Sequence, residues 1–255
     1  MTEQQPAVLY RDEWVLAIDK PAGRLSVPGR PTAEPGERAL SVQVRELAEG
    51  ALPVHRLDRG TSGVLLFALG REAHRALNRA FEERRAEKSY LALARGVLAA
   101  ETTCELPLHE GRAGAVRVAR PGERAQAALT CLRPQEKFAA FTLIDARPRT
   151  GRTHQIRVHL AALGLPLALD DRYGAPRAQQ QLTAGELHPG AAGPGRVVLA
   201  RTPLHAAALR VPHPRGRGWL AIESPLPADL AECLELLRAA RRATGAAETG
   251  RPPTR

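Results

Sequence analysis

Cysteine is scarce in this 255-residue sequence. Cys104, Cys131 and Cys233 lie far apart and form no CxxC pair, which excludes a zinc ribbon and a disulfide framework. An odd number of cysteines also suits a reducing compartment. Residues 1–20 contain neither a basic region nor an apolar stretch, so we expect no secretory signal and a cytoplasmic protein.

Long hydrophobic runs and the common cofactor motifs are absent as well. The longest apolar run, Val64–Leu69, is far shorter than the roughly 20 residues of a membrane-spanning helix, which excludes a membrane protein. There is no GxxxxGK[ST] phosphate loop and no GxGxxG after a strand, and Ser62 lies in GTSGV, which misses the GxSxG nucleophile elbow. His154 and His159 are five residues apart, so a helix would turn them away from a shared metal. We therefore expect no metal and no cofactor.

Lysine is the third scarcity, although the chain is strongly basic. Only Lys20, Lys88 and Lys137 are lysines, while Lys and Arg together number 37 against 27 Asp and Glu, giving a formal net charge of +10. The preference for arginine has two explanations, because arginine suits contacts with phosphates and bases, and GC-rich coding also enriches it. The net charge itself favours a polyanionic partner, and nucleic acid is the first candidate.

Apolar spacing and turn residues predict many strands and few helices. Thr153 is the expected N-cap of one helix and Gly164 its expected stop. Residues 28–36 are expected to form a loop, and residues 175–196, which contain few large apolar side chains, a surface excursion. The expected helices are 40–50, 71–85, 153–163 and 228–242, and the expected strands are 14–18, 64–69, 89–95, 103–108, 115–119, 126–133, 138–146, 197–201, 206–211 and 219–223.

This order of elements favours an α+β fold with a largely antiparallel mixed sheet flanked by helices. No repeat is visible, and no Pro/Gly linker separates two complete cores, so we expect one domain over residues 9–242. Residues 1–8 and 243–255 are expected to be disordered tails.

The most informative segment is His55–Ala68, which places Asp58 between Arg56 and Arg59 just before Gly60 and an apolar strand. Neighbouring guanidinium groups keep a carboxyl ionised, as a nucleophile or a base requires. A structural ion pair at the entrance of a strand is the alternative interpretation. The residue types and their spacing do not decide between the two.

The same segment resembles HRLDxxTSGLLLFA, a signature of the RluA family of pseudouridine synthases. The resemblance spans about residues 14 to 225, and the family's other blocks have counterparts in the same order. These counterparts are KPAG at 20–23, KSYLAL at 88–93, GRTHQIRVH at 151–159, PLALDDRYG at 166–174, and LHA at 204–206 with HP at 213–214.

Finer features concern the subfamily and its target. The segment LSVPGR at 25–30 resembles the RluA type itself, whose members modify a uridine in a hairpin loop of 23S rRNA and another in a tRNA anticodon loop. The RNA-binding S4 module of many relatives is not expected ahead of the first strand. Leu169 stands where the family usually has glycine, which puts the local turn in question.

The resemblance implies an isomerase without cofactor that converts uridine to pseudouridine in RNA. It implies that Asp58 starts the reaction, either by attacking the nucleoside or by removing the C2′ proton to give a glycal. It further implies that Arg157 pairs with Asp58 and keeps it anionic, and that Tyr90 stacks on the base and assists loss of the C5 proton.

An enzyme that acts on a base in a folded loop must extrude it. By resemblance, Arg56 fills the vacated position, and Ile156 belongs to the substrate-binding set. Lys20, Lys88, Arg152 and the arginines of 71–85 are candidate phosphate contacts, although a solvated charged face explains the arginines of that helix equally well. His55 is expected to be a structural support.

Two other functions remain open at this stage. One is an RNA-binding or RNA-remodelling protein on a synthase scaffold that has lost catalysis, and the other is a general basic ribosome-associated protein. The intact set of Asp58, Tyr90 and Arg157 favours an enzyme, and the order of the motifs disfavours the second alternative. We expect a monomer whose partner is rRNA, tRNA or both.

Overall fold

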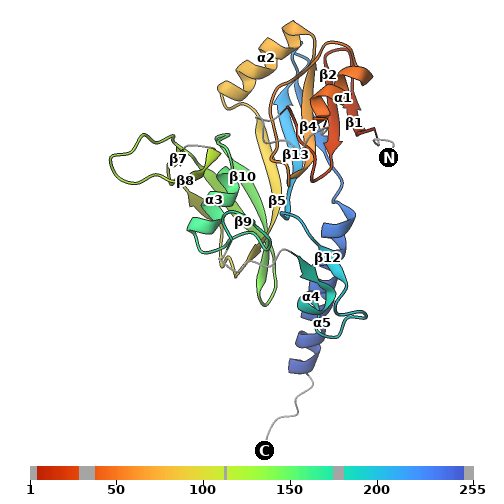
Figure 1. The fold of residues 1–255 in the computed structure, drawn as a ribbon, viewed down its shortest axis with the longest axis vertical. Coiled ribbons are helices and arrows are strands. Elements are labelled where there is room, and N and C mark those ends of the chain that lie inside the picture. The colour runs from red at the N-terminus through yellow and green to blue at the C-terminus, as the bar shows by residue number, and fades with distance from the viewer. Residues whose placement is uncertain (1–4, 29–37, 112–113, 175–180, 250–255) are drawn as a thin grey trace, which may run out of the picture.

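A ten-stranded sheet forms the body of the molecule in the computed structural model, which describes residues 5–28, 38–111, 114–174 and 181–249 (Figure 1). Five helices lie in these ranges: α1 (Leu40–Leu47), α2 (Arg71–Glu82), α3 (Gln155–Ala162), α4 (Ala184–Leu187) and α5 (Ala228–Thr249). The strands are β1 (Ala7–Arg11), β2 (Val15–Lys20), β3 (Ala51–Pro53), β4 (Ser62–Leu69), β5 (Glu87–Arg95), β6 (Thr102–Cys104), β7 (Leu108–Glu110), β8 (Val116–Val118), β9 (Thr130–Lys137), β10 (Phe141–Pro148), β11 (Leu182–Thr183), β12 (Val197–Leu199), β13 (Leu204–Pro212) and β14 (Trp219–Glu223).

The sheet joins strands from both ends of the chain. Its order is β1-β2-β4-β13-β5-β10-β9-β6, with β3 paired to β4 and β14 paired to β13. Its pairings are antiparallel except for β4 with β13, which run parallel. The predicted α+β class with a mainly antiparallel sheet is therefore confirmed.

The first half of the sheet is covered on both faces, which explains the uninterrupted apolar run of β4. Because side chains alternate along a strand, Leu65 and Phe67 pack in the cluster that contains Val44 of α1. Val64 and Leu66 point to the other face, in the cluster that contains residues of α2. A strand buried on both faces has no polar side to show in its sequence.

The second half of the sheet repeats this arrangement with other helices. Ala92 and Ile144 pack in the cluster that includes Ile156 and Leu160 of α3. Leu93 and Leu143 pack on the opposite face, in the cluster that includes buried residues of α5. The two halves meet at β4 and β13, in the middle of the sheet (Figure 1).

Gly63 makes this junction possible. It pairs with Ala206 across the parallel contact, and its φ is +111°. A Cβ at this position would lie 2.2 Å from the Ala206 carbonyl oxygen, so only glycine fits. Next to it, the Ser62 hydroxyl and His205 Nδ1 form a buried hydrogen bond of 3.0 Å. The TSG motif thus carries the connection between the two halves.

Several predicted boundaries are wrong. The α3 helix has His154 as its N-cap instead of Thr153, with a left-handed backbone and no capping hydrogen bond from its side chain. Residues 103–108 span two separate strands, β6 and β7, because the chain leaves the main sheet between them. The Gly164 stop is as predicted, since its φ of +73° ends the helix in a left-handed turn.

The segments expected to be irregular also differ from the prediction. Within 175–196, Leu182, Ala184 and Leu187 are buried against α5, because α4 closes that part of the core. Helix α5 continues to Thr249, and β1 begins at Ala7, so the predicted disordered tails are wrong for 243–249 and for Ala7 and Val8. The expected loop at 28–36 lies, from residue 29 on, outside the described residues, as do residues 175–180.

No described helix is both long enough and apolar enough to span a bilayer.

Candidate active site

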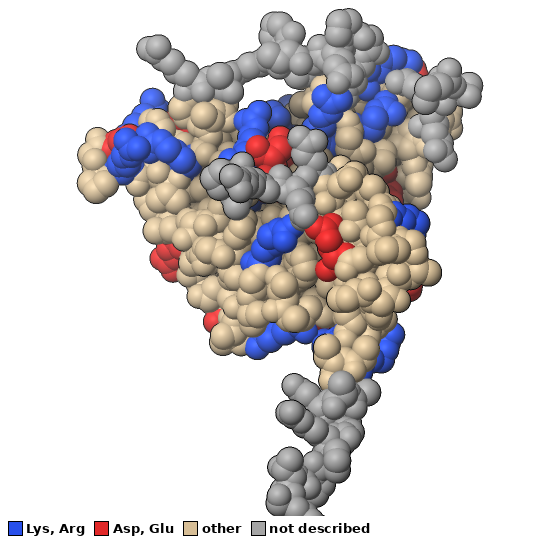
Figure 2. All heavy atoms as spheres, turned by 60° about the horizontal axis from the view of Figure 1, so that its bottom comes forward, with Lys and Arg blue, Asp and Glu red and all other residues tan. Residues whose placement is uncertain are grey.

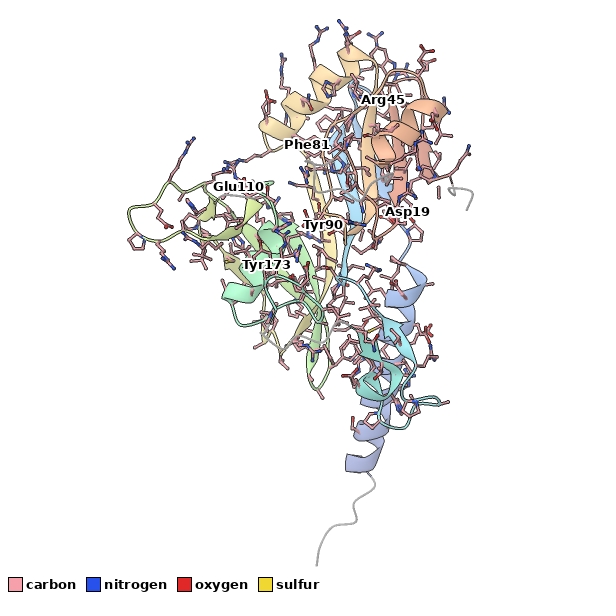
Figure 3. The ribbon with its side chains drawn as sticks, viewed as in Figure 1. Asp19, Arg45, Phe81, Tyr90, Glu110 and Tyr173 are labelled. Carbon is pink, nitrogen blue, oxygen red and sulfur yellow. The ribbon has the colours of Figure 1, made fainter. Side chains whose placement is uncertain are left out.

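A cavity of about 480 Å³ opens between the two halves of the sheet. Three stretches line most of it: 54–58 before β4, 81–90 from the end of α2 into β5, and 148–157 around the start of α3. Figure 3 shows Tyr90 near the centre of the molecule, with Phe81 above it. Residues far apart in the sequence therefore meet at one site.

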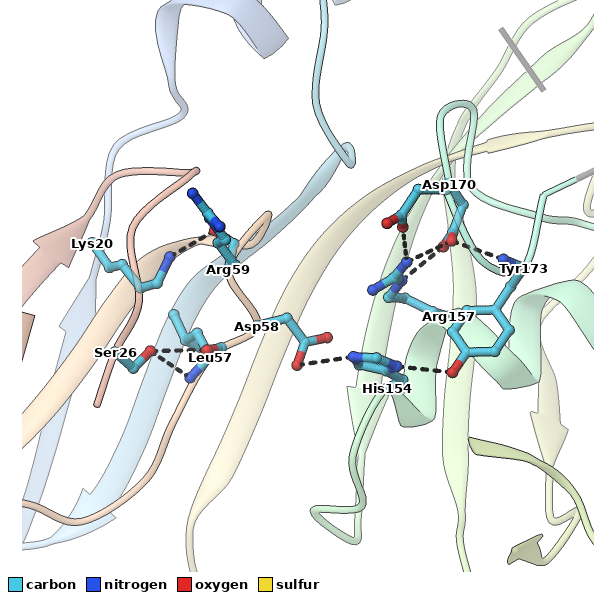
Figure 4. A network of polar contacts seen from close by, with 10 residues as sticks. Lys20, Ser26, Leu57, Asp58, Arg59, His154, Arg157, Asp170 and Tyr173 are labelled. Carbon is cyan, nitrogen blue, oxygen red and sulfur yellow. Dashed lines mark hydrogen bonds and ion pairs between the residues drawn. The ribbon is translucent and has the colours of Figure 1, made fainter. Parts of the chain in front are cut away.

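Asp58 enters the cavity from a loop that is held by buried polar contacts. Ser26 Oγ donates to the Leu57 carbonyl at 2.8 Å and accepts from the Leu57 amide at 3.0 Å. The Asp58 side chain is 21% exposed and points across the cavity toward α3 (Figure 4). The carboxylate is therefore both fixed at its base and accessible.

Lys20 supports the same loop from below. Its Nζ donates to the carbonyls of Pro21, Arg59 and Thr61 at 3.0, 3.1 and 2.7 Å. Burial lowers the pKa of this ammonium to about 7, while the charge of Asp58 acts in the opposite direction. Lys20 has no exposed surface, so it holds the loop of Asp58 and is not available to RNA phosphates, contrary to the prediction.

Tyr90 lies on β5 at the floor of the cavity. It packs against the clusters on α1 and on α3, so both halves of the molecule position its ring. Burial, together with the nearby charge of Asp58, raises the pKa of its hydroxyl group. The phenol is therefore protonated at neutral pH and presents an aromatic face beside the carboxylate.

Arg157 is buried on α3, and its partners differ from the expected one. Its Nε and Nη2 donate to Asp170 at 2.8 and 2.6 Å, and Nη2 also donates to Asp171 at 2.6 Å. Burial opposes ionisation, but the hydrogen bonds that Arg157 donates to Asp170 and the charges of Asp170 and Asp58 keep the pKa of Arg157 above its usual value. The charge of Arg157 thus acts on Asp58 through space, and the predicted direct pair is not formed in this structure.

His154 is the group that approaches Asp58 most directly. Its Nε2 lies 3.8 Å from Asp58 Oδ1, and its Nδ1 lies 2.8 Å from the Tyr173 hydroxyl oxygen (Figure 4). Burial lowers the pKa of His154, and Arg157 and Arg172 lower it further, while Asp58 raises it. The imidazole is therefore neutral at pH 7, and its Nδ1, on the side away from Asp58, is hydrogen-bonded to Tyr173.

Basic side chains surround this centre. Arg56 and Arg152 are exposed on the cavity wall, and Arg152 Nε donates to the Ala127 carbonyl at 3.2 Å. Lys88 Nζ donates to the Thr150 carbonyl at 3.1 Å, and burial lowers its pKa to about 8. Apart from the neutral histidines His55 and His154, the ionisable residues that line the cavity are Arg56, Arg84, Lys88, Arg149, Arg152 and Arg157 against Asp58 and Glu82.

Basic side chains are also grouped on the molecular surface outside the cavity. On the face seen in Figure 2, basic side chains gather mainly in the upper half of the view. A polyanion is attracted to such a cavity, and unpaired bases can enter where the phosphates cannot.

A family model described as RNA pseudouridylate synthase matches residues 14–162, and this range contains Asp58, Tyr90, His154 and Arg157. The chain belongs to that family. It is therefore an RNA pseudouridine synthase, an isomerase, as the sequence motifs predict.

Relatives of this synthase cover most of its length. It is 40% identical over 240 residues to the ribosomal large subunit pseudouridine synthase C of Salmonella typhi, covering 91% of this chain and 70% of that protein. The protein of the same name in Escherichia coli K12 is 39% identical over 243 residues, with coverage of 92% and 70%.

Solved structures show the same fold. The human RNA pseudouridylate synthase domain containing 4 has a TM-score of 0.73 at 24% identity, covering 91% of this chain and 93% of that one. The human RNA pseudouridylate synthase domain containing 1 has a TM-score of 0.69 at 28% identity, covering 92% and 94%. The predicted synthase-like architecture is therefore confirmed.

The structure of the synthase brings together most of the residues singled out from its sequence. Asp58, Tyr90, Arg157, Arg56, Ile156, Lys88 and Arg152 all line the cavity, and Lys20 lies beneath it. His55 is a structural support, as expected. Its Nε2 accepts from the Leu66 amide at 3.0 Å, and its ring stacks on Phe81 at 5.3 Å.

Sequence reasoning missed His154, Asp170 and Tyr173 as members of the site. Each lies in a block that supported the resemblance, GRTHQIRVH or PLALDDRYG, so the signal was present without a role attached to it. Leu169, in place of the usual glycine, is buried in the core beneath α5, and the turn at Asp170 forms with it.

Within the part of the chain that the structure describes, no three His, Cys, Asp or Glu side chains are grouped to hold a metal ion.

Proposed function

We propose that this synthase isomerises a uridine in large-subunit rRNA and that Asp58 starts the reaction. The target is supported by the names of the bacterial relatives, which act on the ribosomal large subunit. The role of Asp58 is supported by one observation above the others: its carboxylate is held at the base, accessible, and directed into a basic cavity beside Tyr90.

The chemistry needs no external reactant. The N1–C1′ bond of the uridine breaks, the uracil turns within the cavity, and C5 bonds to C1′. The proton on C5 is then lost and N1 gains one, so the product is an isomer of the substrate. Both routes from Asp58, attack on the nucleoside or removal of the C2′ proton, begin with the same anionic carboxylate.

The neighbours of Asp58 have separate roles in this proposal. Tyr90 stacks on the uracil. Burial and the charge of Asp58 raise the pKa of its hydroxyl group and keep it protonated, so it assists loss of the C5 proton as a relay, accepting that proton on its oxygen while passing its own to another base. Arg157 supplies positive charge from a distance, since its hydrogen bonds go to Asp170 and Asp171. Ile156 forms an apolar part of the wall.

RNA binding is proposed for the exposed cations of the rim. Arg56 can occupy the place left in the RNA when the uridine turns out, because a planar guanidinium stacks and donates at once. Arg152 is exposed on the rim and Lys88 is half-buried in the cavity wall, and both are proposed to contact phosphates of the loop, whereas the buried Lys20 takes no part. A tRNA target, a monomeric state and a cytoplasmic location are further parts of the proposal.

Tritium release tests the function. A large-subunit rRNA transcript and a tRNA transcript are labelled at uracil C5, and wild-type protein is expected to release tritium from the rRNA as C5 exchanges its proton for carbon. Asp58→Asn is expected to release none above background, because the amide is neither a nucleophile nor a base. Glu223→Gln, on the exposed edge strand β14, serves as the control.

The outcomes separate the parts of the proposal. Release by Asp58→Asn at the wild-type rate would remove Asp58 from the mechanism. Release from the tRNA alone would replace the rRNA target, and pseudouridine mapping of the product would locate the modified position.

A further inference from the structure

His154 is held in a costly backbone conformation at the edge of the active site. Its φ of 53° is left-handed, and among the described residues only Arg84 shares this feature without being glycine. Such a conformation costs a non-glycine residue about 1–2 kcal/mol and persists where the surroundings impose it. The His154 side chain makes no capping hydrogen bond at the start of α3, so side-chain capping does not explain this conformation.

The side chain, in contrast, is engaged on both sides. Nδ1 is 2.8 Å from the Tyr173 hydroxyl oxygen, and the two rings meet edge to face at 5.6 Å. Nε2 points to Asp58 Oδ1 at 3.8 Å. The imidazole is only 14% exposed, so the two nitrogens face Tyr173 and Asp58 more than they face solvent.

Tyr173 is itself fixed by the turn that holds Arg157. The Tyr173 amide donates to Asp170 Oδ1 at 2.9 Å, and the Arg157 guanidinium lies 5.1 Å from the centre of the Tyr173 ring. Asp170 also accepts two hydrogen bonds from Arg157. One short turn therefore places both groups that face Asp58, Arg157 directly and His154 through Tyr173.

The chemistry of the partners selects one tautomer of His154. An ionised carboxylate only accepts hydrogen bonds, so the proton of the neutral ring belongs on Nε2, toward Asp58. Nδ1 is then an acceptor and takes the hydrogen bond from the Tyr173 hydroxyl. Burial raises the pKa of that hydroxyl, which keeps its proton available.

We propose that His154, held by Tyr173, is a positioning residue that orients the Asp58 carboxylate for the isomerisation. Nε2–H engages Oδ1 and leaves Oδ2 to face the nucleoside. Closing 3.8 Å to a hydrogen bond requires a movement of about 1 Å, and contacts of this kind tighten when substrate fills a site. The inference rests on the proposed role of Asp58.

Single-turnover tritium release, with enzyme in excess over labelled large-subunit rRNA, tests the role. His154→Asn keeps a residue that tolerates the left-handed backbone but cannot reach both partners. Tyr173→Phe keeps the ring beneath Arg157 and removes only the hydroxyl. We expect His154→Asn to slow isomerisation at least about tenfold and Tyr173→Phe about threefold to tenfold.

A positioning role differs from a structural one in what stays constant. RNA affinity, measured by filter binding, is expected to stay within about twofold of wild type, and the melting temperature within a few degrees. The double variant is expected to be as slow as His154→Asn alone, because Tyr173 acts through His154. Wild-type rates for His154→Asn, losses that follow RNA affinity or melting temperature, or additive effects would each overturn the proposal.

The chain contains a matched control of the same residue types. Just after β1, remote from the cavity, Asp12 accepts from the Tyr10 hydroxyl at 3.0 Å and lies 2.8 Å from His213 Nε2. Tyr10→Phe and His213→Asn are expected to isomerise at the wild-type rate. If wild-type protein binds rRNA but releases no tritium, the proposed function of Asp58 is overturned, and the role of His154 with it. If Asp58→Asn is slow while His154→Asn is as fast as wild type, only the role of His154 is overturned.

Discussion

Individual side chains in this synthase differ most from their expected roles where they are buried. Lys20 is the clearest case, because a cation enclosed in protein is stable only when its donors are satisfied. An ammonium has three N–H groups, and all three are used by the carbonyls of Pro21, Arg59 and Thr61. The loop of Asp58 thus depends on a residue that RNA cannot touch.

Replacing Lys20 by methionine is expected to destabilise the protein by about 3 kcal/mol, because three carbonyls lose their buried donor. The rate of isomerisation is expected to fall as well, since the loop that carries Asp58 loses its support. Urea unfolding measures the first effect and tritium release the second. Lys137→Met is the control, because Lys137 is exposed and donates to a single carbonyl, that of Ala99. Equal stability of the two variants would contradict the structural role of Lys20.

At the scale of elements, the junction of β4 and β13 decides whether a site exists. Two residue pairs, His205 with Ser62 and Ala206 with Gly63, make the parallel contact. Asp58 lies on one side of this junction, and Arg157 and His154 lie on the other, so a small shift of the strands separates them. A parallel contact between segments so distant in sequence cannot be read from local patterns.

Gly63→Ala is expected to destabilise the protein by more than about 4 kcal/mol and to abolish activity, because the added methyl group cannot be placed. It would lie 2.2 Å from a backbone oxygen that belongs to the sheet and cannot move aside. The measurement is the yield of soluble protein and its urea midpoint. Gly195→Ala adds the same methyl group where no atom lies within 4 Å, and wild-type behaviour is expected there. A folded, active Gly63→Ala variant would show that the strands at the junction can separate.

The whole molecule encloses several neutral histidines, which couples its stability to pH. Burial lowers the pKa values of His55, His154, His159 and His205 in the folded state. For His55 the value is about 3, and its Nε2 accepts a hydrogen bond from the Leu66 amide that an imidazolium could not accept. The unfolded chain binds protons at these residues near pH 6.5, so it gains protons before the folded protein does.

The free energy of unfolding is therefore expected to be highest above pH 6.5 and to fall as the pH drops from 6.5 toward 5. Each histidine that is protonated only in the unfolded chain contributes a loss of about 2 kcal/mol by pH 5. Urea unfolding at pH 8 and at pH 5 measures the loss. His55→Gln is expected to reduce the difference between the two pH values by about 2 kcal/mol, with its own pH 8 value as the reference. An unchanged difference would show that His55 takes up a proton without unfolding.

Much of this synthase could be predicted from its sequence, because local chemistry carries the signal. Alternating or continuous apolar runs predicted β4, β5 and β14, and the motif around Asp58 predicted the family and the location of the site. Apolar spacing alone failed at boundaries, as at Thr153 and in 175–196, where tertiary contacts override local preference.

The sequence by itself determined the class of the fold, the basic character that suits RNA, and, through its motifs, that Tyr90 and Arg157 share a site with Asp58. Only the tertiary structure decided their partners: Lys20 with three carbonyls, Arg157 with Asp170 and Asp171, and His154 between Asp58 and Tyr173. The physical reason is that apolar periodicity and motifs act over a few residues, whereas a hydrogen bond depends on positions within a fraction of an ångström. Those positions are set by the packing of the two halves of the sheet around the cavity.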